Sequence, residues 1–201
     1  MNNFEFIGDR RRAFIYELFR SWHNTLVRYE SALAVIEGLP YWYIERTNVG
    51  LLAAAALRIG AFPLEEYSIS KGRVANRSTG RADLWILFPN GTTYDFEAKQ
   101  TWVSLNSNKI ANIIEPLLSE AVREAKNLSQ RSDFSVGIVF VVTYVSPSSE
   151  INLSSFREQI ININSYGGDF TAVHFCNEII WRERIEDCSV YPGIAVVGRY
   201  G

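Results

Sequence analysis

The stretch that most constrains the fold covers residues 80–100, where two strand-like segments flank the tripeptide Pro89-Asn90-Gly91. A three-residue hairpin loop needs a first residue with φ of about −65°, a second in the bridge region and a third in the left-handed region. Proline, asparagine and glycine meet these needs in order, whereas a two-residue Asn-Gly turn would leave the proline in a strand. We therefore predict a β-hairpin in which Phe88 pairs with Thr92.

This register decides which side chains share a face of the hairpin. Counted back from the loop, the pairs on the polar face are Asp83 with Glu97, Trp85 with Asp95, and Arg81 with Lys99. Two carboxylates that face each other repel, so Asp83 and Glu97 require a cation, a shared proton or a nearby Lys or Arg. A divalent metal is one solution. An exposed face on which Asp83 pairs with Lys99 or Arg81 is the alternative.

The rest of the chain predicts a mixed α/β protein. Apolar residues at helical spacing predict helices over residues 9–36, 40–60, 110–128 and 152–163. Strand-like segments cover residues 67–69, 82–88, 92–99, 134–145, 170–175 and 193–200. The helix over 110–128 predicts a crossover that sets the strand after it parallel to the strand before it.

The sequence shows no repeat, no low-complexity tract and no linker, so residues 1–201 are expected to form a single domain. Within it we expect a helical extension over residues 1–38, a core over 39–145, and added helices and strands over 146–201. Only two cysteines are present, Cys176 and Cys188, and no segment has the pattern of a secretion signal or a membrane span. These features favour a soluble protein of the cytoplasm.

An Asp on one strand followed by Glu-x-Lys on the next is the pattern by which this sequence resembles the PD-(D/E)xK nuclease superfamily. The superfamily includes many restriction endonucleases, recombination nucleases and Holliday junction resolvases. The resemblance covers residues 45–145 and implies a restriction endonuclease-like α-β-β-β-α-β core. It also implies that Asp83, Glu97 and the Ala98 carbonyl bind Mg²⁺ or Mn²⁺, while Lys99 orients the attacking water or helps to deprotonate it.

The match has irregular points. The proline that precedes the aspartate in the family is Ala82 here. Many members carry a Glu on the first core helix, and Glu45 is in the matching place as a further metal ligand and catalytic residue. An acid in the first turn of a helix is also favoured by the helix dipole, whatever the function. The tripeptide alone is a weak signal, because Glu124-Ala125-Lys126 repeats it within a predicted helix, where we interpret it as ordinary surface composition.

Charge limits where a polyanion can bind. The chain has 20 Lys and Arg residues against 22 Asp and Glu residues, a net charge of −2, so any phosphate site must be local. Four basic residues and no acid lie between Glu66 and Asp83: Lys71, Arg73, Arg77 and Arg81. We predict a phosphate-contacting loop here, with a solvated basic loop as the alternative.

Other polar or aromatic residues are given structural interpretations. His23 and His174 lack the spacing of a metal site, and a lone histidine is more often structural. Asp95 is interpreted as a solvated strand residue near the hairpin tip. The aromatic run over residues 41–43 is assigned to the core, without a functional role.

The sequence therefore predicts a metal-dependent nuclease that hydrolyses phosphodiester bonds, with DNA as the expected substrate and restriction, repair or mobile-element action as the expected context. Its partner would be nucleic acid and not a membrane, and paired cleavage of duplex DNA would favour a homodimer. The alternative is a nuclease-like fold without catalysis that acts as a nucleic-acid-binding or protein-binding regulatory module.

Overall fold

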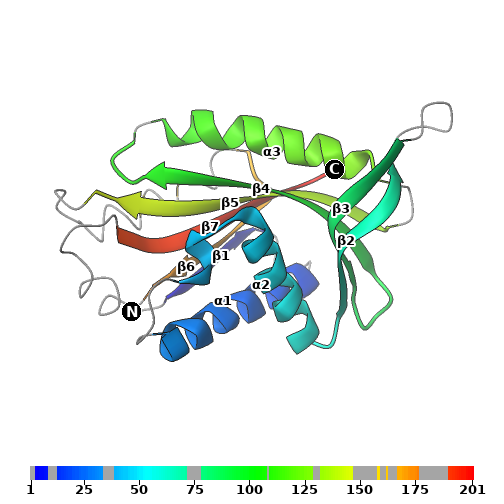
Figure 1. The fold of residues 1–201 in the computed structure, drawn as a ribbon, viewed down its shortest axis with the longest axis horizontal. Coiled ribbons are helices and arrows are strands. Elements are labelled where there is room, and N and C mark those ends of the chain that lie inside the picture. The colour runs from blue at the N-terminus through cyan, green and yellow to red at the C-terminus, as the bar shows by residue number, and fades with distance from the viewer. Residues whose placement is uncertain are drawn as a thin grey trace.

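The computed structural model describes residues 3–8, 13–33, 39–71, 78–107, 109–128, 132–146, 158, 162, 167–176 and 190–201. For residues 69–71 and 78–80 it describes the backbone alone. The described strands form one seven-stranded sheet with helices on both of its faces (Figure 1).

The N-terminal segment contains a strand as well as the predicted helix. β1 (Phe4–Gly8) pairs antiparallel with β6 (Phe170–Phe175) at one edge of the sheet, and α1 (Ala13–Leu33) follows it. The prediction of a purely helical extension over residues 1–38 is therefore wrong. The reason is that the alternating Phe-Glu-Phe segment at residues 4–6 suits a strand that buries one face.

The helix predicted over residues 40–60 is divided near its start. η1 (Pro40–Trp42) is a single 3-10 turn, and α2 (Glu45–Arg58) begins three residues later, because Ile44 is extended with φ −98° and ψ 162°. Proline begins the short turn, as its fixed φ allows. Gly60 follows the helix with φ 77°, the left-handed conformation that a glycine adopts without strain.

The predicted hairpin is confirmed in β3 (Ser78–Leu87) and β4 (Thr93–Ser104). The Phe88 amide donates to the Thr92 carbonyl at 2.9 Å, and Gly91 has φ 87°. Both observations match a three-residue loop. β2 (Phe62–Lys71) pairs antiparallel with the other edge of β3, so three antiparallel strands follow α2 in the sequence.

The predicted crossover is also present. α3 (Ile110–Lys126) connects β4 to β5 (Phe134–Val145), and β5 pairs parallel with β4 from Tyr94 to Ser104. The helix packs closely on the strand, because a Cβ added at Gly137 would lie 2.3 Å from the Val122 amide nitrogen. Glycine at this position lets the α3 backbone approach the sheet.

β6 and β7 (Val190–Tyr200) complete the sheet, whose strand order is β1-β6-β7-β5-β4-β3-β2. Only β4 and β5 are parallel neighbours within it. The mixed α/β class is thus confirmed. The helix predicted over residues 152–163 lies outside the described residues, apart from the single positions 158 and 162.

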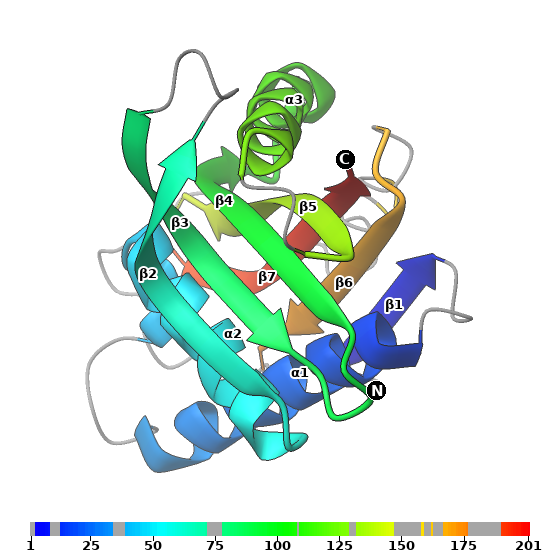
Figure 2. The same cartoon turned by 90° about the vertical axis from the view of Figure 1, so that its right-hand side faces the viewer.

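Two apolar cores lie on opposite faces of the sheet (Figures 1 and 2). α1 and α2 cover one face, where Leu84, Phe96 and Ala98 are buried, and α3 covers the other. Because side chains alternate along a strand, the odd-numbered residues Glu97 and Lys99 turn toward the α3 face. The polar and apolar faces of the hairpin are therefore divided as the register predicted.

No helix in the described part of the chain is long and apolar enough to cross a membrane. The longest of them, α1, has 21 residues and is amphipathic. Its buried side chains face the sheet at a spacing of three or four residues: Ile15, Leu18, Phe19, Trp22 and Leu26.

Candidate active site

The candidate site lies where two neighbouring strands stop pairing. β3 and β4 pair from Leu87 and Thr93 as far as Leu84 and Phe96, whereas β4 continues to Ser104 along β5. β2 and β3 curve away from the second half of β4 (Figure 1). This opening leaves one edge of β4 without a strand partner, one residue before Asp83 would meet Glu97.

Two carboxylates bind the backbone groups that this opening frees. Asp83 accepts a hydrogen bond from the Ala98 amide at 2.7 Å through Oδ2. Glu45, the first residue of α2, accepts one from the Gln100 amide. Because amides of alternate residues point to the same strand edge, the two acids lie along one edge of β4.

Burial raises the pKa of Glu45, and the neighbouring Asp83 carboxylate raises it further. The charge of Lys99 acts in the opposite direction. The helix start, the β3 strand and the β4 strand therefore bring Glu45, Asp83 and Lys99 into electrostatic contact. We call Glu45, Asp83, Glu97, Ala98 and Lys99 the split site.

Glu97 is the buried member of the split site. Its relative exposure is 3%, and its charge contributes to raising the pKa of Tyr67, which places it near the phenol of β2. Continued from the last observed pair, the hairpin register sets Glu97 across from Asp83. Asp83 is only partly buried, so one acid is enclosed while its counterpart faces the opening.

Lys99 is held by an acid that the sequence analysis did not select. Its Nζ lies 2.7 Å from Glu124 Oε2 on α3, with the two side chains 24% and 30% exposed. Burial lowers the pKa of Lys99, but the hydrogen bond and charge of Glu124 outweigh it, so the pKa is raised. Lys99 is thus a charged ammonium in this structure.

The interpretation of Glu124 as ordinary surface composition is wrong. Helical periodicity offered a signal, because Glu124 is three residues after Ala121 and directly before Ala125, both of which are fully buried against the sheet. An acid beside the buried face of α3 can reach a lysine on the strand below it.

Asp95 is buried rather than solvated, which corrects its predicted role. Its relative exposure is 2%, and its Oδ1 accepts a hydrogen bond from the Tyr67 hydroxyl. Burial raises the pKa of Tyr67, and the bond to Asp95 raises it further. The pairing of Asp95 with Trp85 is confirmed, so the error lay in the assumption that the hairpin tip is open to solvent.

Arg81 does not face Lys99 as the register predicted. It pairs with Ser68 of β2, and its exposed guanidinium lies 3.2 Å from Glu66, because β3 leaves β4 before this position. Of the predicted basic loop, Arg73 and Arg77 lie outside the described residues, and for Lys71 only the backbone is described. Residues 10–12, the second basic cluster, also lie outside them.

The oxygen donors of the split site suit a hard divalent cation. Among the described residues, no group of three or more His, Cys, Asp or Glu side chains is arranged to hold a metal. A metal would therefore rely on Asp83, Glu97 and the Ala98 carbonyl, which points to the same strand edge as the Ala98 amide. Asp83 Oδ1 remains available for this role, since only Oδ2 receives the amide.

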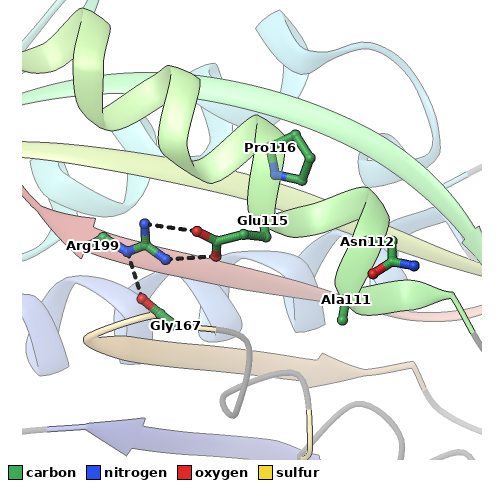
Figure 3. A pocket seen from close by; sticks show the side chains of 6 residues that line it. All are labelled: Ala111, Asn112, Glu115, Pro116, Gly167 and Arg199. Carbon is green, nitrogen blue, oxygen red and sulfur yellow. Dashed lines mark hydrogen bonds and ion pairs between the residues drawn. The ribbon is translucent and has the colours of Figure 1, made fainter.

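A separate pocket of about 580 Å³ lies between α3 and the end of β7 (Figure 3). Arg199 dominates its polar lining, but Glu115 binds both terminal nitrogens of the guanidinium, at 2.7 and 3.3 Å, and the Gly167 carbonyl accepts from Nε at 2.6 Å. The charge of Arg199 is therefore already compensated, and the pocket shares no residue with the split site.

The two histidines form a second cluster of ionisable groups. His23 Nδ1 lies 2.9 Å from His174 Nδ1, and His174 Nε2 lies 2.7 Å from Glu30 Oε1. α1 supplies His23 and Glu30, seven residues apart on one helix face, and β6 supplies His174. We call these three residues the histidine chain.

Comparison with protein-family models, curated proteins and solved structures returns no match. The function is therefore argued from the residues of the split site.

Proposed function

We propose that this protein is a metal-dependent nuclease of the restriction endonuclease-like type. The observation that carries the proposal is the hairpin register, which sets Asp83 across from Glu97 at the point where β3 and β4 separate. Lys99 follows two residues later on the same face. The order α2-β2-β3-β4-α3-β5, with β4 parallel to β5, supports the same reading.

The opening between β3 and β4 gives the site access to a substrate. A divalent metal would polarise the scissile phosphate and lower the pKa of a bound water. Asp83 and Glu97, with the Ala98 carbonyl, would hold it. The hydrogen bond from the Ala98 amide fixes the orientation of the Asp83 carboxylate, as hydrogen bonds to metal-binding side chains commonly do.

Lys99 is better suited to bind a phosphate oxygen than to act as a free base. Glu124 raises its pKa, so the ammonium keeps its proton at neutral pH. A protonated lysine stabilises negative charge on the phosphate and can orient the water. Glu45, whose own pKa is raised, would become a ligand once a cation offsets the charge of Asp83.

A second function has one specific observation in its favour. Asp83 and Glu45 already satisfy backbone amides on the free edge of β4, and Lys99 already pairs with Glu124. These residues would therefore be needed for the fold even without catalysis. This observation favours a nuclease-like module that binds nucleic acid or protein and does not cleave.

The deciding experiment is cleavage of supercoiled plasmid and of single-stranded DNA in Mg²⁺ or Mn²⁺. Glu97→Gln and Lys99→Ala should each lower the rate by about 10²- to 10⁴-fold, because each removes a group that acts on the reacting phosphate or the metal. The matched controls are Asp95→Asn, a buried acid on the same strand, and Lys126→Ala, the lysine of the second Glu-Ala-Lys tripeptide. Activity that is absent from the wild type, or equal in Glu97→Gln, would leave the binding module as the better explanation.

A further inference from the structure

Two exposed aromatic side chains border the split site. Trp102 is 46% exposed on β4, and Tyr43 is 55% exposed in the link between η1 and α2. Both flank the contact between Glu45 and the Gln100 amide, since Tyr43 precedes Glu45 by two residues and Trp102 follows Gln100 by two. We call Tyr43 and Trp102 the aromatic platform.

Hydrogen bonds fix the aromatic platform to the edge of β4. The Trp102 indole donates from Nε1 to the Trp42 carbonyl at 3.2 Å, and Gln100 donates from Nε2 to the Tyr43 carbonyl at 2.6 Å. Asn48 holds the same Gln100 side chain by donating to its Oε1 at 2.8 Å. The segments that carry both rings are therefore positioned in advance, which reduces the entropy lost when a ligand binds.

The aromatic run at residues 41–43 thus has two roles, of which the sequence analysis assigned one. Tyr41 is fully buried and donates to the Tyr191 carbonyl at 2.8 Å, as a core residue does. Tyr43 points to the surface, and Ile44 beside it is 60% exposed. A surface with two fixed aromatic rings next to a charged lysine has the chemistry that binds bases and phosphates together.

We infer that the aromatic platform stacks the unpaired bases of a nucleic-acid strand whose backbone crosses the split site. The substrate class is then single-stranded or locally unpaired nucleic acid, and this inference rests on the proposed nuclease function. Bases within a duplex are already stacked on their neighbours, so their faces are not available to an exposed ring.

The spacing along β4 agrees with this arrangement. Lys99 and Trp102 are three residues apart in an extended strand, which corresponds to about 10 Å at roughly 3.3 Å per residue. Successive phosphates of one stacked strand rise by about 3.4 Å. A base on Trp102 would therefore belong to a nucleotide about three positions from a phosphate at Lys99.

The test is fluorescence anisotropy of the full chain with labelled strands and without added metal, so that binding is measured apart from cleavage. The strands are a 12-nucleotide oligodeoxythymidine, the matching oligouridine, a duplex and an abasic strand of equal length. Trp102→Ala and Tyr43→Ala should each weaken binding of a base-containing strand by about 5- to 100-fold. Trp102→Phe, which keeps a ring, should retain most of it.

The matched control is Phe62→Ala, which removes a 65% exposed aromatic ring of β2 that is not part of the platform. Binding of either the deoxythymidine or the uridine strand that is lost in both platform variants supports the inference, and the tighter of the two identifies the sugar. The inference is overturned if the wild type binds the abasic strand or the duplex as tightly, or binds none of them. It is also overturned if both platform variants bind like Phe62→Ala.

These outcomes are separable from those of the proposed function. Cleavage that depends on Glu97 together with unchanged binding in Trp102→Ala keeps the nuclease and removes the platform. Ring-dependent binding without any cleavage in Mg²⁺ or Mn²⁺ removes the nuclease and keeps a single-strand-binding surface.

Discussion

The split site and the histidine chain use similar side chains in opposite ways. Each joins acids to basic groups, but the split site assembles at an opening of the sheet, where Asp83, Glu45 and Lys99 are only partly buried. The histidine chain is enclosed between α1 and β6, with His174 and Glu30 at 0% and 4% exposure. A buried network must satisfy itself, whereas a partly open one retains capacity for a ligand.

Aromatic rings seal the histidine chain. Phe4 stacks on His23 with ring centroids 5.1 Å apart, and the rings of Trp22 and Tyr41 lie 6.2 and 6.0 Å from that of His174. The single hydrogen between the two Nδ1 atoms and the bond to Glu30 use three of the four ring nitrogens. The difference from the split site suggests that one cluster stabilises the fold and the other acts on a substrate.

The largest effect should come from breaking the histidine chain. His174→Ala leaves the Glu30 carboxylate buried without its partner, which should lower the free energy of unfolding by about 3–5 kcal/mol. His23→Ala, at the more exposed end of the chain, should cost less. Urea unfolding monitored by circular dichroism measures both. Equal and small losses would show that the histidine chain is not a stability element.

A metal should act on the other cluster. If the split site binds Mn²⁺ or Mg²⁺, a concentration 100 times the dissociation constant should add about 2.7 kcal/mol to the stability of the folded state. A thermal melt with and without the metal measures this gain.

Asp83→Asn should abolish the gain, while His23→Ala, which leaves the split site intact, should preserve it. A wild-type melting temperature that does not respond to either metal would favour the binding module. The same increase in Asp83→Asn would mean that the metal binds elsewhere.

The sequence predicted the hairpin well because its determinants are local. Pro89, Asn90 and Gly91 each require a particular backbone conformation, and the strand period then fixes which residues face each other. The crossover to β5 followed from the same kind of local pattern. Nothing local indicated that β3 would leave β4 after Leu84, because that depends on where η1 and α2 pack.

The residues that sequence reasoning missed are those brought in by other elements. Glu124 reaches Lys99 from α3, and Tyr67 reaches Asp95 from β2. His23 and His174 meet across 151 positions of sequence. One chain without an alignment carries no signal for such long-range pairs, although burial of one face of α3 restricted where Glu124 could lie.

Acidification should weaken the enclosed cluster. Burial lowers the pKa of His23 to about 4, and the neighbouring His174 lowers it further, against a raising effect of Glu30. Neutral His23 is therefore favoured in the folded state, and its contribution is fully present above pH of about 6.5 and lost as the pH falls through about 4. Since His23 is partly exposed, the loss should be on the order of 1 kcal/mol.

Melting temperatures of the wild type and His23→Gln between neutral and acidic pH measure this contribution. The variant should show the shallower decline over that interval, because it has no proton to take up at this position. Parallel curves for the two proteins would contradict the assignment of the lowered pKa to His23.

The smallest effect should be the coupling between Lys99 and Glu124 at the open cluster. The pair lies 2.7 Å apart with both side chains in partial contact with solvent, so a double-mutant cycle of Lys99→Met and Glu124→Gln at neutral pH should give about 0.2–1 kcal/mol. Because Glu124 raises the pKa of Lys99, this coupling is fully present below the unfolded lysine pKa and disappears as the pH rises through the folded value. Salt at 1 M, where the screening length is about 3 Å, should reduce it further, while the loss caused by His174→Ala should hardly change. If salt affects both alike, the two clusters do not differ in their access to solvent, and the division between a closed structural network and an open site fails.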